Sequence, residues 1–253
     1  MFFDSHAHYD DARFDSDRNH LLSAMQENNV SLILNAGADI PTSKAAYKLT
    51  QKYDFMYSAA GVHPHDTDSL SEDLLSEIEH LLYCKKVVAV GEIGLDYYYD
   101  NSPREIQKKW FYRQLELAQK HNMPVIIHDR DAHQDCMDMI RDFPDLKIVF
   151  HCFSGSPEMA KQLLSRGVLI SFAGPVTFKN ARKQQETAKI VPDDMFLIET
   201  DSPYLSPEPN RGKRNDSTNL KYIAQKLAEL KNTTIEEIAA LSMANAKRFF
   251  NIS

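Results

Sequence analysis

Histidines and carboxylates, the residue types that bind divalent metal ions, follow several apolar runs of this sequence. Six of them stand out: His6, His8, Glu92, His128, His151 and Asp201. In an extended segment the side chains at positions i and i+2 point to the same side, so His6 and His8 can reach one ion. Glu92 is predicted to end a buried strand, where a carboxylate is costly unless it is paired or bound to a metal. The set predicts a metal centre.

Each of these residues also has an ordinary structural explanation. His128 and His151 could be hydrogen-bonded core histidines, and Glu92 could belong to a structural salt bridge. Asp201 could cap a turn. Without a metal, several unrelated structural roles would have to place histidines and carboxylates at the ends of different strands by coincidence. We therefore favour the metal centre.

The number of candidate ligands indicates more than one ion. Six ligands exceed the three or four protein ligands that one catalytic zinc ion takes. Two ions that share a hydroxide must lie about 3.5–4 Å apart, and a bridging carboxylate sets that distance. Glu92 is the candidate bridge. Imidazole mixed with carboxylate suits zinc, manganese or magnesium, and the sequence does not choose among them.

Short apolar or β-branched runs alternate with segments of helical period along the whole chain. Several runs are continuously apolar, as in strands of a parallel sheet that is covered on both faces. This alternation predicts an α/β protein with a single TIM-type (β/α)8 barrel, possibly distorted, whose active site lies at the carboxyl ends of the strands. A doubly wound open sheet is the competing topology, but no glycine-rich dinucleotide motif supports it. The predicted strands are Phe2–Ser5, Ser31–Asn35, Phe55–Ala59, Val87–Gly91, Pro124–Ile127, Lys147–Phe150, Val168–Ser171 and Met195–Ile198.

Two helices can be predicted from the pattern of their apolar residues. In residues 106–118 the apolar positions share one side and leave Lys108, Lys109 and Gln114 for solvent. Near the end of the chain, Thr234 and Glu237 have the spacing of a capping box, which predicts an extra C-terminal helix on the outside of the barrel. The polar stretch Ser202–Ser217 between these helices is predicted to be a long functional loop.

Composition limits the class of protein. The chain has 253 residues, with 29 Lys plus Arg against 36 Asp plus Glu and a net charge of −7. This excludes a broad basic surface that coats nucleic acid. The absence of a signal-like start and of a long apolar run predicts a cytoplasmic protein without a membrane partner. The three cysteines are predicted to be reduced thiols. We expect one domain over residues 1–253 and no obligate protein partner.

The motifs of this chain resemble those of the TatD-type metal-dependent hydrolases, also called TatD deoxyribonucleases, over almost its whole length. The motifs are Asp4-Ser-His-Ala-His8, Gly61-Val-His-Pro-His65, Gly91-Glu-Ile-Gly-Leu-Asp-Tyr97, Ile127-His-Asp-Arg130, His151-Cys-Phe-Ser-Gly155, Glu199-Thr-Asp-Ser-Pro-Tyr204 and Arg211-Gly-Lys-Arg-Asn215. The resemblance implies hydrolysis of phosphoester bonds, often in DNA, with a 3′–5′ exonuclease as the expected type. It also implies that His6, His8 and Asp201 hold one ion, and that His128 and His151 hold the other.

The expected substrate, DNA or another phosphoester, is anionic, so positive groups should lie near the ions. Arg130, Arg211 and Arg214 are the candidates, because a guanidinium group can bind phosphate through two parallel hydrogen bonds. His63 is a candidate substrate contact and His65 a weaker one. Tyr97 could stack on a base, or it could simply pack at the rim of the site. Glu92 and Asp201 are the predicted catalytic residues, and Asp201 would orient the attacking water or accept its proton.

Two other functions stay open from the sequence. A binuclear site in a barrel can also hydrolyse an amide, a lactone or another ester, and such a substrate would not need the three arginines. A non-enzymatic, metal-stabilised binding module is a weaker alternative, because its site would be closed by protein ligands and would leave no position for water.

Overall fold

The computed structural model describes residues 1–252, which fall into two compact units. The first unit comprises residues 1–35, 152–165 and the chain from 169 onward. The second comprises residues 36–151 and 166–168.

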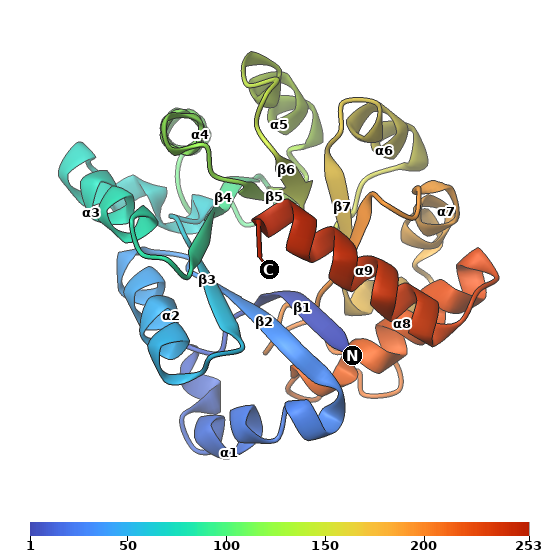
Figure 1. Cartoon of the computed structure of the whole chain (residues 1–253). Helices are drawn as coiled ribbons and strands as arrows, with labels where there is room; N and C mark the ends of the chain where they lie inside the picture. Colours follow the sequence, from blue (N-terminus) through green and yellow to red (C-terminus); the bar gives the residue numbers. More distant parts are fainter. Residues whose placement is uncertain (253) are drawn as a thin grey trace. The chain divides into compact units, whose positions relative to one another are not determined.

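The first unit contains both ends of the chain (Figure 1). Strand β1 pairs in parallel with β2, and β7 pairs in parallel with β8. Just past β8, Ser202 bridges in parallel to Ala7, so β1 is flanked by β2 and by the segment that follows β8. The strands are β1 (Phe2–Ala7), β2 (Val30–Ala36), β7 (Leu169–Phe172) and β8 (Phe196–Ile198). The helices are α1 (Arg18–Ser23), α6 (Pro157–Leu164), α7 (Arg182–Ile190), α8 (Leu220–Lys231) and α9 (Ile235–Phe250).

The second unit contains the middle of the chain, in which strands and helices alternate (Figure 1). Strand β4 pairs in parallel with β3 and β5, and β5 pairs in parallel with β6. The strands are β3 (Met56–Ala60), β4 (Val87–Asp96), β5 (Val125–Arg130) and β6 (Ile148–Phe150). The helices are α2 (Ile40–Lys52), α3 (Glu72–Leu82), α4 (Arg104–His121) and α5 (His133–Met139).

All eight predicted strands are present, and their order in the sheet is β1 to β8. This strand order, with helices between successive strands, is the one that a (β/α)8 barrel requires. Within residues 1–252, no helix combines the length and apolar character needed to span a membrane. Among the described residues, Cys84, Cys136 and Cys152 form no disulfide bond.

Strand β4 is longer than predicted, and this corrects the position of one candidate ligand. The strand continues to Asp96, so Glu92 lies inside it and not at its end. His6 and His128 also lie inside their strands, β1 and β5. Gly94 allows a close approach between β4 and β5 within the longer strand. Its φ is +147°, and a Cβ there would lie 2.0 Å from the carbonyl oxygen of His128.

Helix α4 differs from its predicted pattern at one position. Gln114 is completely buried, whereas the sequence predicted it to face solvent. Its Oε1 accepts a hydrogen bond from the backbone N–H of Val62 at 2.8 Å, and its Nε2 donates to the carbonyl of Val62 at 3.0 Å. A polar residue is tolerated there because it pairs both backbone groups of a buried segment. That segment leads directly to His63.

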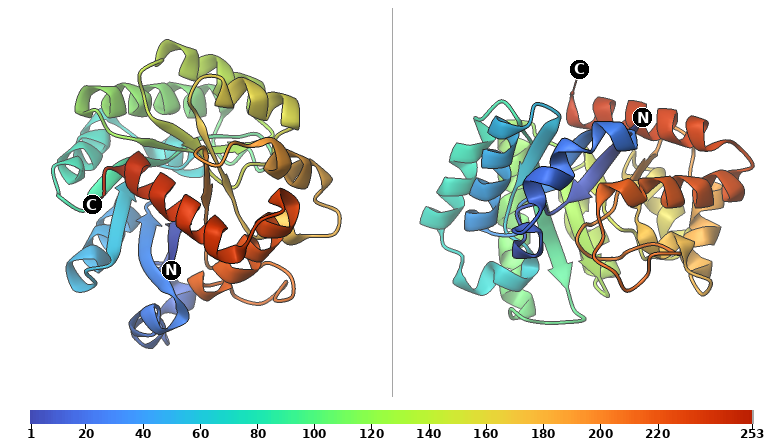
Figure 2. Two further views of the ribbon diagram at one scale, coloured as in Figure 1. Left: turned by 45° about the vertical axis from the view of Figure 1, so that its right-hand side comes forward. Right: turned by 90° about the horizontal axis from the view of Figure 1, so that it is seen from below.

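The extra C-terminal helix, α9, is present. The Thr234 hydroxyl accepts a hydrogen bond from the backbone N–H of Glu237 at 3.2 Å, which gives the helix its predicted N-cap. Helix α9 contacts β1 and β8 of the same unit (Figure 2). The ring centroids of Phe250 and Phe3 are 6.1 Å apart, so the helix packs its apolar side on the first strand.

Candidate metal centre

The first unit brings together three of the predicted ligands, His6, His8 and Asp201, which we call the first cluster. The Nε2 atoms of His6 and His8 lie 3.1 Å apart. The Oδ1 atom of Asp201 lies 3.3 Å from Nε2 of His8 and 3.8 Å from Nε2 of His6. Two imidazoles and one carboxylate thus direct their ligand atoms at one point, which is the arrangement that a divalent ion requires.

Backbone hydrogen bonds hold the first cluster together across almost the entire sequence. The N–H of Asp201 donates to the carbonyl of His6 at 2.9 Å, and the N–H of His8 donates to the carbonyl of Ser202 at 2.7 Å. These bonds fix the segment after β8 beside the end of β1. The two imidazoles and the carboxylate are therefore positioned by main chain as well as by their own contacts.

Asp4 supports the first cluster from within the core. Its side chain is completely buried and accepts hydrogen bonds from the Thr200 N–H at 2.9 Å, the Thr200 hydroxyl at 2.6 Å and the Ser217 hydroxyl at 2.6 Å. Burial raises the pKa of Asp4 to about 7, although these hydrogen bonds act in the opposite direction. Because Thr200 directly precedes Asp201, these hydrogen bonds fix the segment that carries the candidate ligand Asp201.

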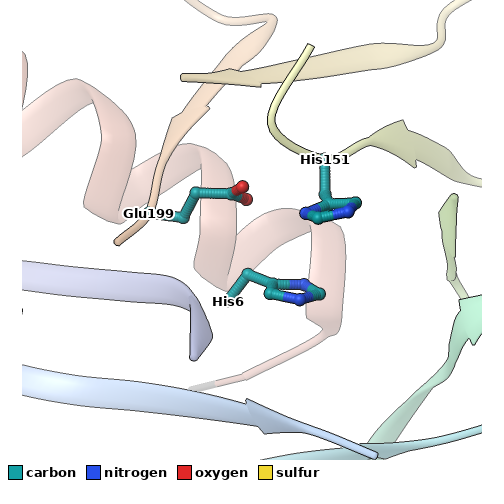
Figure 3. A group of neighbouring side chains, drawn as sticks. All are labelled: His6, His151 and Glu199. Atoms are coloured by element: carbon teal, nitrogen blue, oxygen red, sulfur yellow. The ribbon is translucent and has the colours of Figure 1, made fainter. Parts of the chain in front are cut away.

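Glu199 is a further carboxylate at this place that the sequence analysis did not select. It is buried and accepts hydrogen bonds from the Cys152 N–H at 2.8 Å and from the Ser171 hydroxyl. A ligand atom of Glu199 lies within 4.8 Å of one of His6 (Figure 3). Its position two residues before Asp201, at the end of an apolar run, was the signal that could have found it.

The second unit brings together Glu92, His128, His151 and His63, which we call the second cluster. The Oε1 atom of Glu92 lies 2.7 Å from Nε2 of His151 and 2.8 Å from Nδ1 of His128. It lies 3.7 Å from Nε2 of His63. Ligand atoms of His63, Glu92 and His128 all lie within 4.8 Å of one another, so this group could hold a metal ion.

Burial and neighbouring charges set the protonation of the second cluster. Burial alone would raise the pKa of Glu92, but the charges and hydrogen bonds of His151, His63 and His128 hold it well below its usual range. Burial lowers the pKa of His63 well below its usual range. For His128, burial acts to lower the pKa, yet hydrogen bonds to Asp96 and Glu92 raise it on balance. The cluster thus keeps an ionised carboxylate among imidazoles, as a metal site requires.

Asp96 and His65 extend the second cluster, and the sequence analysis gave neither a ligand role. The Oδ2 atom of Asp96 lies 3.0 Å from Nε2 of His128 and 2.9 Å from Nε2 of His65. Although burial acts to raise the pKa of Asp96, its hydrogen bonds to His128 and His65 hold it well below the usual range. Asp96 therefore orients the His128 ring by binding the nitrogen that faces away from Glu92.

Two of the predicted substrate contacts lie in the long loop after β8. Arg214 forms a two-bond ion pair with Asp17, at 2.6 and 2.8 Å, and its guanidinium lies 4.7 Å from the centre of the Phe14 ring. Arg211 is exposed, and its guanidinium stacks 4.2 Å from the centre of the Phe178 ring. Arg211 is thus the more available of the two cations.

The remaining predicted substrate contacts lie in the second unit. Tyr97 donates its hydroxyl proton to Asp135 at 2.5 Å, and the guanidinium of Arg104 lies 4.3 Å from its ring centre. This is the rim packing that the sequence left open for Tyr97. Arg130 is exposed and lies over the ring of Tyr98, with 4.8 Å between guanidinium and ring centre. His63 belongs to the second cluster itself.

The residues of both clusters fit divalent metal ions. The first cluster combines two imidazoles with the partly exposed carboxylate of Asp201, and in the second cluster the buried carboxylate of Glu92 contacts the imidazoles of His63, His128 and His151. When the negative charge of a buried carboxylate is balanced mainly by imidazoles, a divalent cation can bind to the carboxylate and the imidazoles together. In the first unit, the three ligand atoms already converge.

Comparisons with known proteins agree with this fold and these clusters. Residues 3–251 match the model of the family described as TatD related DNase. The chain is 44% identical to the uncharacterized metal-dependent hydrolase YabD of Bacillus subtilis, over 100% of both chains. It is 33% identical to a protein of Shigella flexneri serotype 5b named 3′-5′ ssDNA/RNA exonuclease TatD, with 99% of each chain covered.

A solved structure shares the complete fold. The crystal structure of YJJV, a TatD homologue from Escherichia coli K12, matches with a TM-score of 0.93 and 29% identity, over 100% of this chain and 98% of that one. The predicted TIM-type barrel class is thereby confirmed. Fold and sequence together define a metal-dependent hydrolase. The chain belongs to the family of TatD-related DNases.

Proposed function

We propose that this hydrolase cleaves phosphoester bonds in nucleic acid and acts as a deoxyribonuclease of the 3′–5′ exonuclease type. A relative that is 33% identical over 99% of both chains is named as a 3′-5′ ssDNA/RNA exonuclease, which supports a nucleic-acid substrate. A cytoplasmic location and the absence of an obligate protein partner stay predictions from the sequence.

The observation that carries the proposal is the pair of clusters, each of which combines imidazoles with a carboxylate. His6, His8 and Asp201 would hold one divalent ion. His128 and His151 would hold a second, and Glu92 would bridge the two. When bound, the two ions supply Lewis acidity and lower the pKa of water, so that hydroxide is available near neutral pH. Zinc, manganese and magnesium all suit this mixture of ligands.

Glu92 and Asp201 are the proposed catalytic residues. Glu92 is almost fully buried, its pKa is held well below the usual range, and one of its oxygens contacts three imidazoles. A carboxylate has two oxygens and can bridge two ions, and this is the role we assign to Glu92. Asp201 has a partly exposed side chain, in contact with His8 and His6. A carboxylate at that position can orient the attacking water and accept its proton.

The substrate's negative charge must be balanced locally, because the chain as a whole carries a net charge of −7. We assign Arg130, Arg211 and Arg214 to the phosphate groups and His63 to another substrate contact. Tyr97 is a weaker candidate contact, because its hydroxyl is bonded to Asp135 and the guanidinium of Arg104 packs on its ring. Arg214 would have to exchange its ion pair with Asp17 for a phosphate, so we expect Arg130 and Arg211 to contribute more. Binding should be modest and sensitive to salt.

The test is an activity panel on the protein loaded with zinc, manganese or magnesium in turn. The substrates are single-stranded DNA labelled at either end, duplex DNA, RNA and bis(p-nitrophenyl) phosphate. We expect stepwise shortening of single-stranded DNA from its 3′ end, and loss of that activity on chelation. Triple replacement of Arg130, Arg211 and Arg214 by Ala should lower phosphoester cleavage while the metal content is unchanged.

A matched control replaces three exposed cations elsewhere, Lys161→Ala, Lys183→Ala and Lys221→Ala. Inactivity on every phosphoester by protein that holds its metal would overturn the proposal. Amides and lactones would then be the substrates to test, because a binuclear metal site of this kind can also hydrolyse them.

A further inference from the structure

Two tyrosines expose large aromatic surfaces on the loop that follows β4. Tyr98 and Tyr99 are 58% and 62% exposed. Their ring centroids lie 4.8 Å apart, and the ring planes are 87° from each other. Exposed aromatic side chains that lie together mark a binding surface more often than scattered ones do. The edge-to-face packing also limits the freedom of both rings.

The backbone beneath these rings is tied to the second cluster by one buried carboxylate. The Oδ1 atom of Asp96 accepts hydrogen bonds from the N–H groups of Tyr98 and Tyr99, at 3.0 and 2.8 Å. Its Oδ2 atom lies 3.0 Å from Nε2 of His128. The side chain of Asp96 thus spans from the second cluster to the loop. The two tyrosines are therefore held at a fixed, short separation from a candidate metal ligand.

A cation and an imidazole complete this surface. The guanidinium of Arg130 lies 4.8 Å from the centre of the Tyr98 ring, and the His65 ring lies 5.4 Å from that of Tyr99. Within residues 1–252, Arg130 forms no ion pair with an acidic residue. An exposed guanidinium without a carboxylate partner, next to two largely exposed aromatic rings, suits a ligand that carries both a flat ring and a phosphate.

We propose that Tyr98, Tyr99 and Arg130 form a stacking platform for an unpaired base of a single strand, with Arg130 on the neighbouring phosphate. This inference rests on the proposed function and specifies its substrate class. Aromatic side chains stack on any base, because every base has a flat π-face, so the platform accepts different sequences. A base inside a duplex has both faces covered by its neighbours. The platform therefore selects single strands over duplex interiors.

The experiment compares a 12-nucleotide oligothymidylate with a strand of the same length and charge whose residues are abasic. The metal-loaded wild-type protein should prefer the base-bearing strand. In the double variant Tyr98→Ala/Tyr99→Ala, KM for oligothymidylate should rise about 10- to 100-fold with little change in kcat, because each stacked base contributes about 1–3 kcal/mol. The preference for the base-bearing strand should disappear. Tyr98→Phe/Tyr99→Phe, which keeps both rings, should retain it.

Tyr83→Ala is the matched control. Tyr83 is 71% exposed and belongs to the same unit, but it precedes β4 whereas Tyr98 follows it. This control should keep the wild-type preference. Binding to a phosphorothioate oligothymidylate, followed by fluorescence anisotropy, gives the same comparison without turnover.

Two outcomes overturn the platform while the proposed function stands. In one, the wild-type protein cleaves oligothymidylate and Tyr98→Ala/Tyr99→Ala keeps its KM. In the other, the double variant binds the abasic strand more weakly by the same factor as oligothymidylate, which would mean that the lost contact is not base stacking. If the wild-type protein neither binds nor cleaves any strand, the proposed function itself fails, and the platform fails with it.

Discussion

The two clusters are built in different ways, although both combine imidazoles with carboxylates. In the first cluster, His6 and His8 come from the start of the chain and Asp201 from near its end. Asp4 accepts a hydrogen bond from Thr200 and so fixes the segment next to Asp201. In the second cluster, three imidazoles surround one oxygen of Glu92 directly. The first depends on hydrogen bonds from outside the ligand set. In the second the imidazoles contact the carboxylate directly, and Asp96 adds an outside hydrogen bond to His128.

This difference predicts how each cluster responds to the substitution of one of its residues. Charges in the second cluster compensate one another at distances of 2.7–3.7 Å in a buried place, so removing its central carboxylate leaves buried imidazoles without their partner. The first cluster can lose a supporting residue and still keep its ligands. Changes at Glu92 should therefore have larger effects than changes around Asp201.

The largest expected effect is that of Glu92→Ala. The change removes the proposed bridge and the partner of three imidazoles. Hydrolysis should fall by at least about 1,000-fold, which corresponds to about 4 kcal/mol of transition-state stabilisation, and the metal content should fall with it. Activity assays and elemental analysis of the purified variant measure both quantities. Glu92→Gln preserves the shape of the side chain and serves as the control for folding. A folded Glu92→Ala protein that keeps its metal and its rate would rule out the bridging role.

The second prediction separates the clusters by their metal content. Asp201→Asn should lower the bound metal from about two ions to about one per chain, and the rate by about 100- to 1,000-fold, because the first cluster loses its carboxylate and the second is intact. Asp194→Asn, an exposed acidic residue before β8, is the control. Equal metal content in Asp201→Asn and the wild-type protein would remove Asp201 from the ligand set.

The fold and the six candidate ligands that the two clusters bring together could be predicted from the sequence because their signals are local, whereas His63 was predicted only as a substrate contact. Continuously apolar runs mark the strands, and an i, i+2 pair such as His6 and His8 shares one side of a strand. The longer course of β4 could not be predicted, because a glycine within an apolar run suggests a strand end as readily as a close approach. Gly94 serves the close approach, and so Glu92 lies inside the strand.

The residues that support the clusters are less visible in the sequence. Gln114 looked like a solvent-facing residue of a helix, yet it pairs both backbone groups of Val62. Asp96 and Glu199 follow ligand or apolar positions, but the imidazole partners of Asp96 are 31 and 32 residues away along the chain, and the Cys152 partner of Glu199 is 47 residues away. Such roles depend on which distant segments meet. Periodicity and motif spacing carry no information about that.

The third prediction concerns support of the first cluster by Asp4. Asp4→Ala leaves four buried donors without this acceptor: two from Thr200, one from Ser217 and the backbone N–H of His6. The free energy of unfolding should fall by about 2–4 kcal/mol, and the metal affinity of the first cluster by about 10- to 100-fold. Urea unfolding and metal titration measure these changes.

A general loss of structure would weaken both clusters alike, so the second cluster serves as an internal reference for Asp4→Ala. Its metal affinity should fall less than that of the first cluster, because Asp4 binds the segment next to Asp201 and the two ions are coupled only through the proposed bridge, Glu92. Ser217→Ala, which removes one donor and keeps the carboxylate, should have a smaller effect. A variant in which the second cluster loses more metal than the first would contradict the positioning role of Asp4.

The smallest effect is expected at the exposed side of the first unit, where Asp11 pairs with Arg13. The hydrogen bonds and charge of Arg13 lower the pKa of Asp11 from 3.8 to about 2. The folded chain therefore binds this proton more weakly than the unfolded chain does. The resulting stabilisation is present above pH 4 and disappears as the pH falls from about 4 to 2. Since solvent screens this pair, Asp11→Asn should cost below about 1 kcal/mol at pH 7. Urea unfolding of wild type and Asp11→Asn at pH 7, 4 and 3 should show that difference shrinking towards acid pH. A difference that is constant with pH would mean that packing, and not charge, accounts for it.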